Sequence, residues 1–205
     1  IATLREAGIY VLHPGEPIGR TGIVPARSIE VSSAGGNDHG RTEILIDEVP
    51  ITGRPKKGYT FCTVDPRSGW FEAWNRFDTH QSTENSVRMS SWVDSIPDGH
   101  IVIAAVFDDA SFGLRTEAVE ALRKIGSDED IRGKYKWAHL VVGTKESAPG
   151  RAWEKVDPRR IEIDFAPSNL PDEFQNISEC SLLEKLLDMA TTENRTVLYI
   201  TGIDP

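Results

Sequence analysis

The chain has 205 residues, of which 39% are hydrophobic and 27% are charged, the balance of an ordinary soluble globular protein. Its net charge of −9 repels phosphate backbones and anionic lipid headgroups, which argues against nucleic acids and membrane surfaces as partners. No apolar run approaches about 18 residues, so we expect no membrane insertion. The sequence begins at Ile1, from which we expect either a removed leader or an incomplete N-terminus.

The N-terminal part changes in texture near residue 26. Residues 1–25 are rich in glycine and proline and predict an extended arm around a short strand at residues 9–12. Apolar and polar residues then alternate around Ile29 and Ile44, which indicates strands. Residues 59–77 contain two further alternating runs on either side of a turn with Pro and Gly, and they predict a hairpin.

Helices and buried strands follow one another in the middle of the chain. Helical spacing predicts a helix over residues 82–93, and the continuous apolar run 100–106 predicts a strand buried on both faces. A second helix is expected directly after Asp109, with Gly126 at its C-terminal cap. Residues 137–142 predict another buried strand.

The last 50 residues predict a strand at 161–165, a short amphipathic helix at 182–187 and a final strand at 197–200. These patterns divide the chain into an arm, a central domain and a strand–helix–strand extension, at residues 1–25, 26–155 and 156–205.

Two cysteines and two glycosylation sequences bear on the compartment. Cys62 and Cys180 could form one disulfide in an oxidising compartment, or both could be buried free thiols. Asn176 and Asn194 each begin an Asn-x-Ser/Thr triplet and would accept N-linked glycans in a eukaryotic host.

No constellation of residues indicates catalysis. The five histidines are dispersed and form no metal-binding spacing, and the sequence has no nucleophile elbow, Walker loop or dinucleotide fingerprint. We therefore predict a protein that is not an enzyme and that needs no cofactor and no metal.

Two local features allow either a binding role or a structural role. Asp108 and Asp109 follow a buried strand, where they could accept the paired hydroxyls of a sugar or could cap the next helix. Trp70 and Trp74 lie four residues apart on one predicted strand and so share a face, which is either core or a platform for sugars.

Motifs in a fixed order resemble the interleukin-like EMT inducer family, also called PANDER-like or GG domains. They are SSAGG at 32–36 with ILID at 44–47, GYTFCTVDPRSG at 58–69, FDT at 77–79, SIPDGHIV at 95–102, FDDAS at 107–111, LRKIG at 122–126, and WA and VG at 137–138 and 142–143. Together they cover about residues 26–154. The resemblance implies an α/β (α+β) fold in which a compact, sandwich-like pair of β-sheets is flanked by helices.

The resemblance also implies a binding site. Family members include secreted cytokine-like proteins and the stem domain of protein O-mannose N-acetylglucosaminyltransferase. That stem domain binds glycans through an acidic residue in the segment matching 108–109 and a basic residue before the "WA" strand. The cytokine-like members carry more cysteines than the two found here. Carried over, the ligand-binding candidates are Asp108, Asp109, Ser111, Arg132, Lys134, Lys136 and Trp137.

The leading hypothesis is thus a secreted, extracellular, non-enzymatic module whose partner is a glycan or glycoprotein. One alternative is a structural subunit of an extracellular filament, virion appendage or surface assembly. It would self-associate through residues 1–25 and 156–205, by adding strands to neighbouring subunits. A second alternative is a secreted cytokine-like ligand with a protein receptor.

Overall fold

The computed structural model describes residues 9–38, 40–170, 179–192 and 196–199 of the chain. The chain divides into two compact units, one formed by Pro17–Ala166 and the other by Ile1–Glu16 with Pro167–Pro205. The larger unit extends beyond the expected central domain, residues 26–155, at both ends. Ile18 is buried in its core and strand β10 (Ile161–Phe165) pairs within its sheet, so these flanking segments belong to it.

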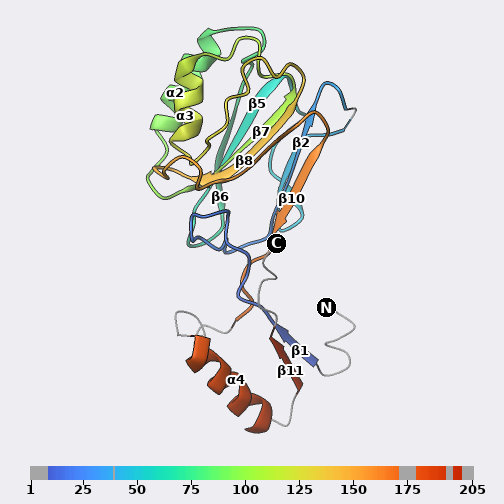
Figure 1. The fold of residues 1–205 in the computed structure, drawn as a ribbon, viewed down its shortest axis with the longest axis vertical. Coiled ribbons are helices and arrows are strands. Elements are labelled where there is room, and N and C mark those ends of the chain that lie inside the picture. The colour runs from blue at the N-terminus through green and yellow to red at the C-terminus, as the bar shows by residue number, and fades with distance from the viewer. Residues whose placement is uncertain (1–8, 39, 171–178, 193–195, 200–205) are drawn as a thin grey trace. The chain divides into compact units, whose positions relative to one another are not determined.

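The described residues of the larger unit contain one open, mixed sheet of nine strands (Figure 1). In chain order they are β2 (Ile29–Gly35), β3 (Glu43–Ile46), β4 (Val49–Pro50), β5 (Gly58–Val64), β6 (Phe71–Phe77), β7 (Ile101–Asp108), β8 (Ala138–Thr144), β9 (Trp153–Asp157) and β10. The expected strands are confirmed, and β4 and β9 were not predicted.

Strand β2 connects two layers of this sheet. It pairs antiparallel with β3 and β10 along most of its length, but parallel with β7 only at Ala34 and Gly35. Strands β6, β5, β7, β8 and β9 form the other layer. Apolar residues of both layers, among them Val31, Ile44, Ile103 and Leu140, form one buried cluster. The layers therefore pack face to face and bury their apolar side chains against each other.

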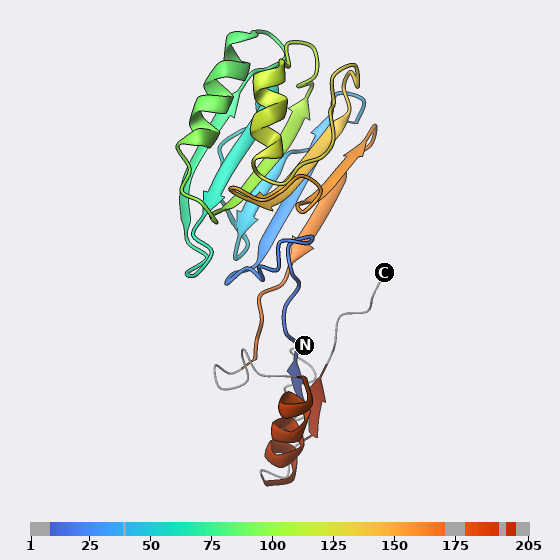
Figure 2. The ribbon, with the colours of Figure 1, turned by 60° about the vertical axis from the view of Figure 1, so that its left-hand side comes forward.

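Two helices cover the other face of the β5–β7–β8 layer (Figure 2). Helix α2 (Glu84–Asp94) and helix α3 (Thr116–Arg123) bury one stripe each against this face. Together with Phe61 and Phe77 of the sheet, these stripes form a second apolar cluster. Strand β7 has buried residues on both faces, which accounts for its uninterrupted apolar sequence. The expected α/β class and the compact, helix-flanked globule are confirmed, and the expected pair of sheets is present as two layers of one nine-stranded sheet.

Helix α3 begins later than predicted. Its N-cap is Arg115, so six residues separate the helix from Asp109. The capping role considered for the two aspartates is therefore wrong, because neither lies at a helix N-terminus. Gly126 follows the helix in a left-handed conformation with φ of +92°, as expected for a residue that ends it.

The smaller unit contains β1 (Ile9–Leu12), β11 (Thr196–Tyr199) and α4 (Glu179–Thr192). Strands β1 and β11 pair in parallel, so the strands of the arm and the tail use each other as partners. Leu12, Leu170, Leu182 and Leu186 form its core. No helix in the described part of the chain has the length and apolar character needed to cross a membrane.

Of the two cysteines, the structure describes the side chain of Cys62. Cys62 carries a free thiol that is buried between the sheet layers. Burial raises the pKa of this thiol to about 12, which keeps it protonated and unreactive. The side chain of Cys180 and the two glycosylation sequences at Asn176 and Asn194 lie outside the described residues.

Candidate functional site

The end of β7 and the loop before β8 meet at the buried carboxylate of Asp109. The backbone N–H of Lys136 donates to Oδ1 of Asp109 over 2.9 Å. The same oxygen accepts the Ser111 hydroxyl at 2.8 Å, while Nδ1 of His80 donates to Oδ2 at 2.6 Å. One side chain thus joins three segments that are far apart in the sequence.

Opposing influences act on the pKa of Asp109. Burial by itself raises it, since a charged carboxylate loses solvation. The hydrogen bonds donated by Lys136, His80 and Ser111 outweigh burial and hold the pKa below its usual range. Asp109 is only 1% exposed, so this ionised group is well placed to position its neighbours and is nearly inaccessible to a ligand.

Two glycines allow the backbones to approach at this point. A Cβ at Gly35 would lie 2.1 Å from the Lys136 carbonyl oxygen, and one at Gly36 would lie 2.4 Å from Oδ1 of Asp108. Asp108 and Lys136 both adopt left-handed conformations, with φ of +61° and +60°. Such conformations cost free energy in residues other than glycine, and they concentrate at functional sites. Gly35 is therefore required where the two stretches meet, because its neighbour there is backbone, whereas Gly36 faces side chains of Asp108 and Lys136.

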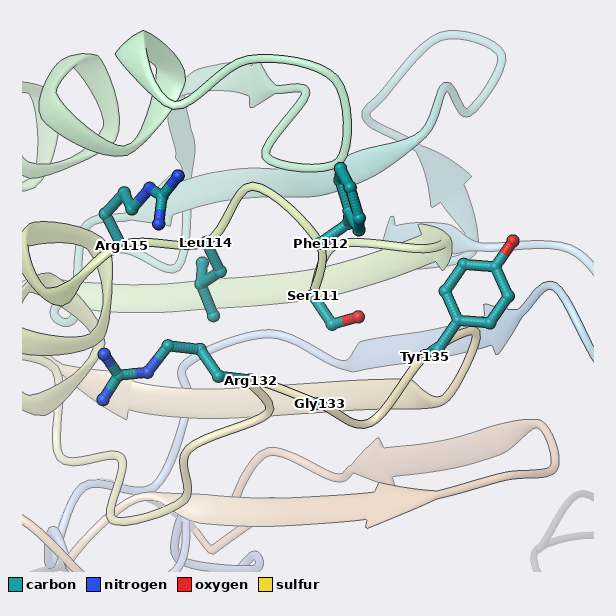
Figure 3. Close-up of a pocket in the computed structure, with 7 residues that line it drawn as sticks. All are labelled: Ser111, Phe112, Leu114, Arg115, Arg132, Gly133 and Tyr135. Carbon is teal, nitrogen blue, oxygen red and sulfur yellow. The ribbon is translucent and has the colours of Figure 1, made fainter.

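A pocket of about 370 Å³ opens beside Asp109, and we call it the aromatic pocket (Figure 3). Its lining residues are Ser111, Phe112, Leu114, Arg115, Arg132, Gly133 and Tyr135. Arg115 and Arg132 lie at one end, Tyr135 lies at the other, and Ser111 and Phe112 lie between them (Figure 3). Because the Ser111 hydroxyl donates to Asp109, its oxygen is left to accept a hydrogen bond from a ligand.

The rings beside this pocket are unusually accessible. Phe112 is 78% exposed and Tyr135 is 55% exposed. The ring of His80 lies between them, with centroids 5.7 Å from Phe112 and 6.5 Å from Tyr135. Since Asp109 holds His80, the buried carboxylate also fixes the centre of this aromatic group. Exposed rings beside polar groups suit a ligand with both apolar and hydroxyl faces.

A second pocket, of about 390 Å³, lies on the other side of Asp108, and we call it the glycine pocket. Its lining residues are Gly35, Gly36, Asp38, Gly40, Phe107, Asp108 and Lys136. Oδ2 of Asp108 lies 3.0 Å from Nζ of Lys57, and this hydrogen bond raises the pKa of Lys57. Lys136 contributes to this pocket and also places its Nζ 5.3 Å from the Tyr135 ring centroid.

The structure places the predicted residues in one region of the domain, but they divide between two pockets and positions outside both. Ser111 and Arg132 line the aromatic pocket, and Asp108 and Lys136 line the glycine pocket. The remaining three predicted residues, Asp109, Lys134 and Trp137, line neither pocket.

Some predicted cations are already paired, and some useful residues were missed. Arg132 donates to both oxygens of Asp130, and Lys134 pairs with Glu129 at 2.7 Å. His80, Phe112, Arg115 and Tyr135 were not predicted. The FDT motif that precedes His80 and the FDDAS motif that precedes Phe112 could have pointed to the first two.

Trp70 and Trp74, for which the sequence allowed either a core or a binding role, lie in the turn before β6 and on β6. Trp70 is 61% exposed and Trp74 is 37% exposed, so neither is a core residue. The Arg27 guanidinium lies 3.7 Å from the Trp70 ring centroid, and that of Arg76 lies 5.0 Å from the Trp74 ring centroid. These rings form a second exposed aromatic surface, which a binding experiment must separate from the aromatic pocket.

A buried network supports the loop that carries Arg132 and Lys136. His139 Nδ1 lies 2.6 Å from the Tyr59 hydroxyl, and His139 Nε2 lies 2.8 Å from Glu154. Glu154 also accepts the backbone N–H groups of Asp128 and Glu129. Burial by itself would raise the pKa of Glu154. The hydrogen bonds from His139 and from this loop outweigh burial and hold the pKa below its usual range, so the carboxylate stays charged. The network thereby ties the start of the loop to β5, β8 and β9.

One group of side chains elsewhere has the composition of a metal site. Asp65, Glu72 and His100 place one ligand atom each within 4.8 Å of one another. Their contacts have a simpler explanation: Glu72 pairs with His100 at 3.2 Å, and Asp65 accepts hydrogen bonds from the turn residues Arg67 and Ser68.

With this geometry described, the chain can be compared with known proteins. Residues 57–147 match the sequence model of the family described as Interleukin-like EMT inducer. Residues 57–147 therefore form an interleukin-like EMT inducer domain. The matched segment includes both ends of the Asp109–Lys136 hydrogen bond and every residue of the aromatic pocket, whereas Gly35 and Gly36 precede it.

Two curated proteins share this domain. The human cell migration-inducing and hyaluronan-binding protein is 33% identical over 88 residues, and its mouse counterpart is 30% identical over the same length. Each match covers 42% of this chain but only 6% of the relative. The resemblance deduced from the ordered motifs is thus confirmed for the interleukin-like EMT inducer domain.

Proposed function

We propose that this domain is a non-enzymatic, extracellular module that binds glycans in the aromatic pocket. The observation that carries the proposal is the pocket's construction, in which accessible rings at Phe112 and Tyr135 lie beside the acceptor oxygen of Ser111. Sugars combine apolar C–H faces with hydroxyl groups, so rings and fixed polar atoms recognise them together.

Two further points support a glycan as partner. The name of the curated relatives includes hyaluronan binding, which concerns a glycan, and they are similar to this chain over 88 residues. The Ser111 hydroxyl of the pocket is held in advance by Asp109, so this polar group loses little conformational freedom on binding. Secretion is part of the proposal, since extracellular glycans are the partners it requires.

The test is binding of the full chain to a glycan array, followed by calorimetry with the best ligand. Tyr135→Ala should weaken binding about 10-fold, because it removes an exposed ring without touching the core. The matched control is Trp70→Ala, which removes an equally exposed ring outside the pocket and should leave affinity unchanged.

The alternatives predict other results. Loss of binding in Trp70→Ala with none in Tyr135→Ala would move the site to the β6 surface. Failure of the folded chain to bind any glycan would refute the proposal and favour a protein receptor, as expected of a cytokine-like ligand.

A further inference from the structure

The cations around the aromatic pocket differ in whether they have a partner. Arg132 is paired with Asp130, Lys134 with Glu129 and Lys57 with Asp108. Among the described residues, Arg115 and Lys136 have no ion-pair partner for their side chains. The pocket therefore keeps uncompensated positive charge, although the chain as a whole carries −9.

The two unpaired cations lie near opposite ends of the pocket. Arg115 is the N-cap of α3, and its backbone N–H is held by the Ser86 hydroxyl at 3.0 Å. Its exposed side chain lies at the end opposite Tyr135, with Leu114 beside it (Figure 3). Lys136 lies beyond the other end, with Nζ 5.3 Å from the Tyr135 ring centroid. An extended ligand lying along the pocket would meet a ring surface between two positive charges.

We propose that the aromatic pocket selects acidic saccharides, whose carboxylate pairs with the guanidinium of Arg115. This inference rests on the proposed glycan-binding function and names its ligand class. A guanidinium presents two parallel N–H donors that match a carboxylate, and such charged hydrogen bonds are stronger than neutral ones. The buried Asp109 opposes this little, since its carboxylate oxygens already accept hydrogen bonds from His80 and from backbone N–H donors and are nearly inaccessible to a ligand.

The inference is tested with two probes that differ only in charge. The first is an oligosaccharide that contains a uronic acid, and the second is the same oligosaccharide with its carboxyl group reduced to the alcohol. Calorimetry with the full chain should give about 10-fold tighter binding of the acidic probe. Arg115→Gln should abolish this preference and leave affinity for the neutral probe within about twofold, because the neutral probe has no carboxylate to lose.

Arg88→Gln is the matched control, since it removes one positive charge from the exposed surface of α2 outside the pocket. It should keep the 10-fold preference. Equal binding of both probes to the natural chain would overturn the acidic preference and leave the glycan-binding function intact. A preference for the acidic probe that survives in Arg115→Gln would likewise overturn the role of Arg115 and leave the glycan-binding function intact. Binding of neither probe, with no other glycan bound on the array, would overturn the function and the inference together.

Discussion

The backbone N–H of Lys136 donates to the carboxylate of Asp109 over 2.9 Å, although 27 residues separate them in the chain. This contact joins the end of β7 to the loop before β8, and the aromatic pocket and the glycine pocket both lie beside it. A ligand site whose polar atoms are fixed from beneath by one buried carboxylate should be sensitive to changes that never touch the ligand.

Replacement of Asp109 by Ala should be strongly destabilising. It leaves the Lys136 backbone N–H, the Ser111 hydroxyl and Nδ1 of His80 without their acceptor. Buried donors without partners each cost free energy, so unfolding should become easier by about 3 kcal/mol, as measured by urea denaturation. The matched control, Asp164→Asn on an exposed position of β10, should change stability by less than about 0.5 kcal/mol. A small effect at Asp109 would show that the network does not hold the two stretches together.

Replacement of Gly35 by Ala should separate the same two stretches by crowding. The new Cβ would lie 2.1 Å from the carbonyl oxygen of Lys136, so the backbone has to move. We expect a loss of about 2–3 kcal/mol in the free energy of unfolding, together with weaker glycan binding. Gly53→Ala provides the control, because a Cβ there meets nothing within 4 Å. Unchanged stability and binding in Gly35→Ala would contradict the required close approach.

The strands and the main helices could be predicted because their signals are local. Residues 101–106 of β7 form an apolar run, and the buried residues Met89 and Val93 of α2 recur at helical spacing. The two-residue strand β4 and the half-buried β9 have no such signal, since their residues show neither alternation nor a long apolar run. Helix α3 was placed too early because an aspartate after a strand also suits an N-cap.

The candidate site was predictable only in part. The family resemblance implied that the segment at 108–109 and a basic residue before Trp137 share a site, but the specific contact of Asp109 with the Lys136 backbone was not predicted, because nothing local in the sequence pairs residues 27 positions apart. Phe112 and Tyr135 lie in loops without periodicity, and a ring in a loop can be core or surface with the same sequence. The burial of Asp109 was not foreseen either, since two of its donors, His80 and Lys136, come from distant segments of the chain.

Acid should destabilise the domain through the buried carboxylate of Asp109 and the partly buried carboxylate of Glu154. The pKa values of Asp109 and Glu154 are lower in the folded protein than the ordinary values, so the unfolded chain binds these protons more readily. Their stabilisation is therefore complete above the ordinary carboxyl range and is lost as the pH falls through the folded values. We expect the urea concentration at the midpoint of unfolding to decrease as the pH is lowered from about 5 to about 3.

Glu154→Gln separates this effect from that of other carboxyl groups. The variant should be less stable at pH 7, because the hydrogen-bond acceptor for His139 and the loop at 128–129 loses its charge. Its stability should nevertheless change less between pH 5 and pH 3 than that of the natural chain, since one titrating group is gone. An equally steep decline in both proteins would assign the acid sensitivity to other carboxylates.

Replacement of Tyr59 by Phe tests the network that supports the site loop. Burial raises the pKa of Tyr59 well above its ordinary value, so the hydroxyl stays protonated and donates to Nδ1 of His139. The Phe variant fills the same space but leaves that buried nitrogen without a donor, and it should cost about 1–3 kcal/mol in urea denaturation. Tyr135→Phe removes a hydroxyl from an exposed ring and should leave stability unchanged. If both variants were equally stable, the tie between Tyr59 and His139 would contribute nothing to holding the loop.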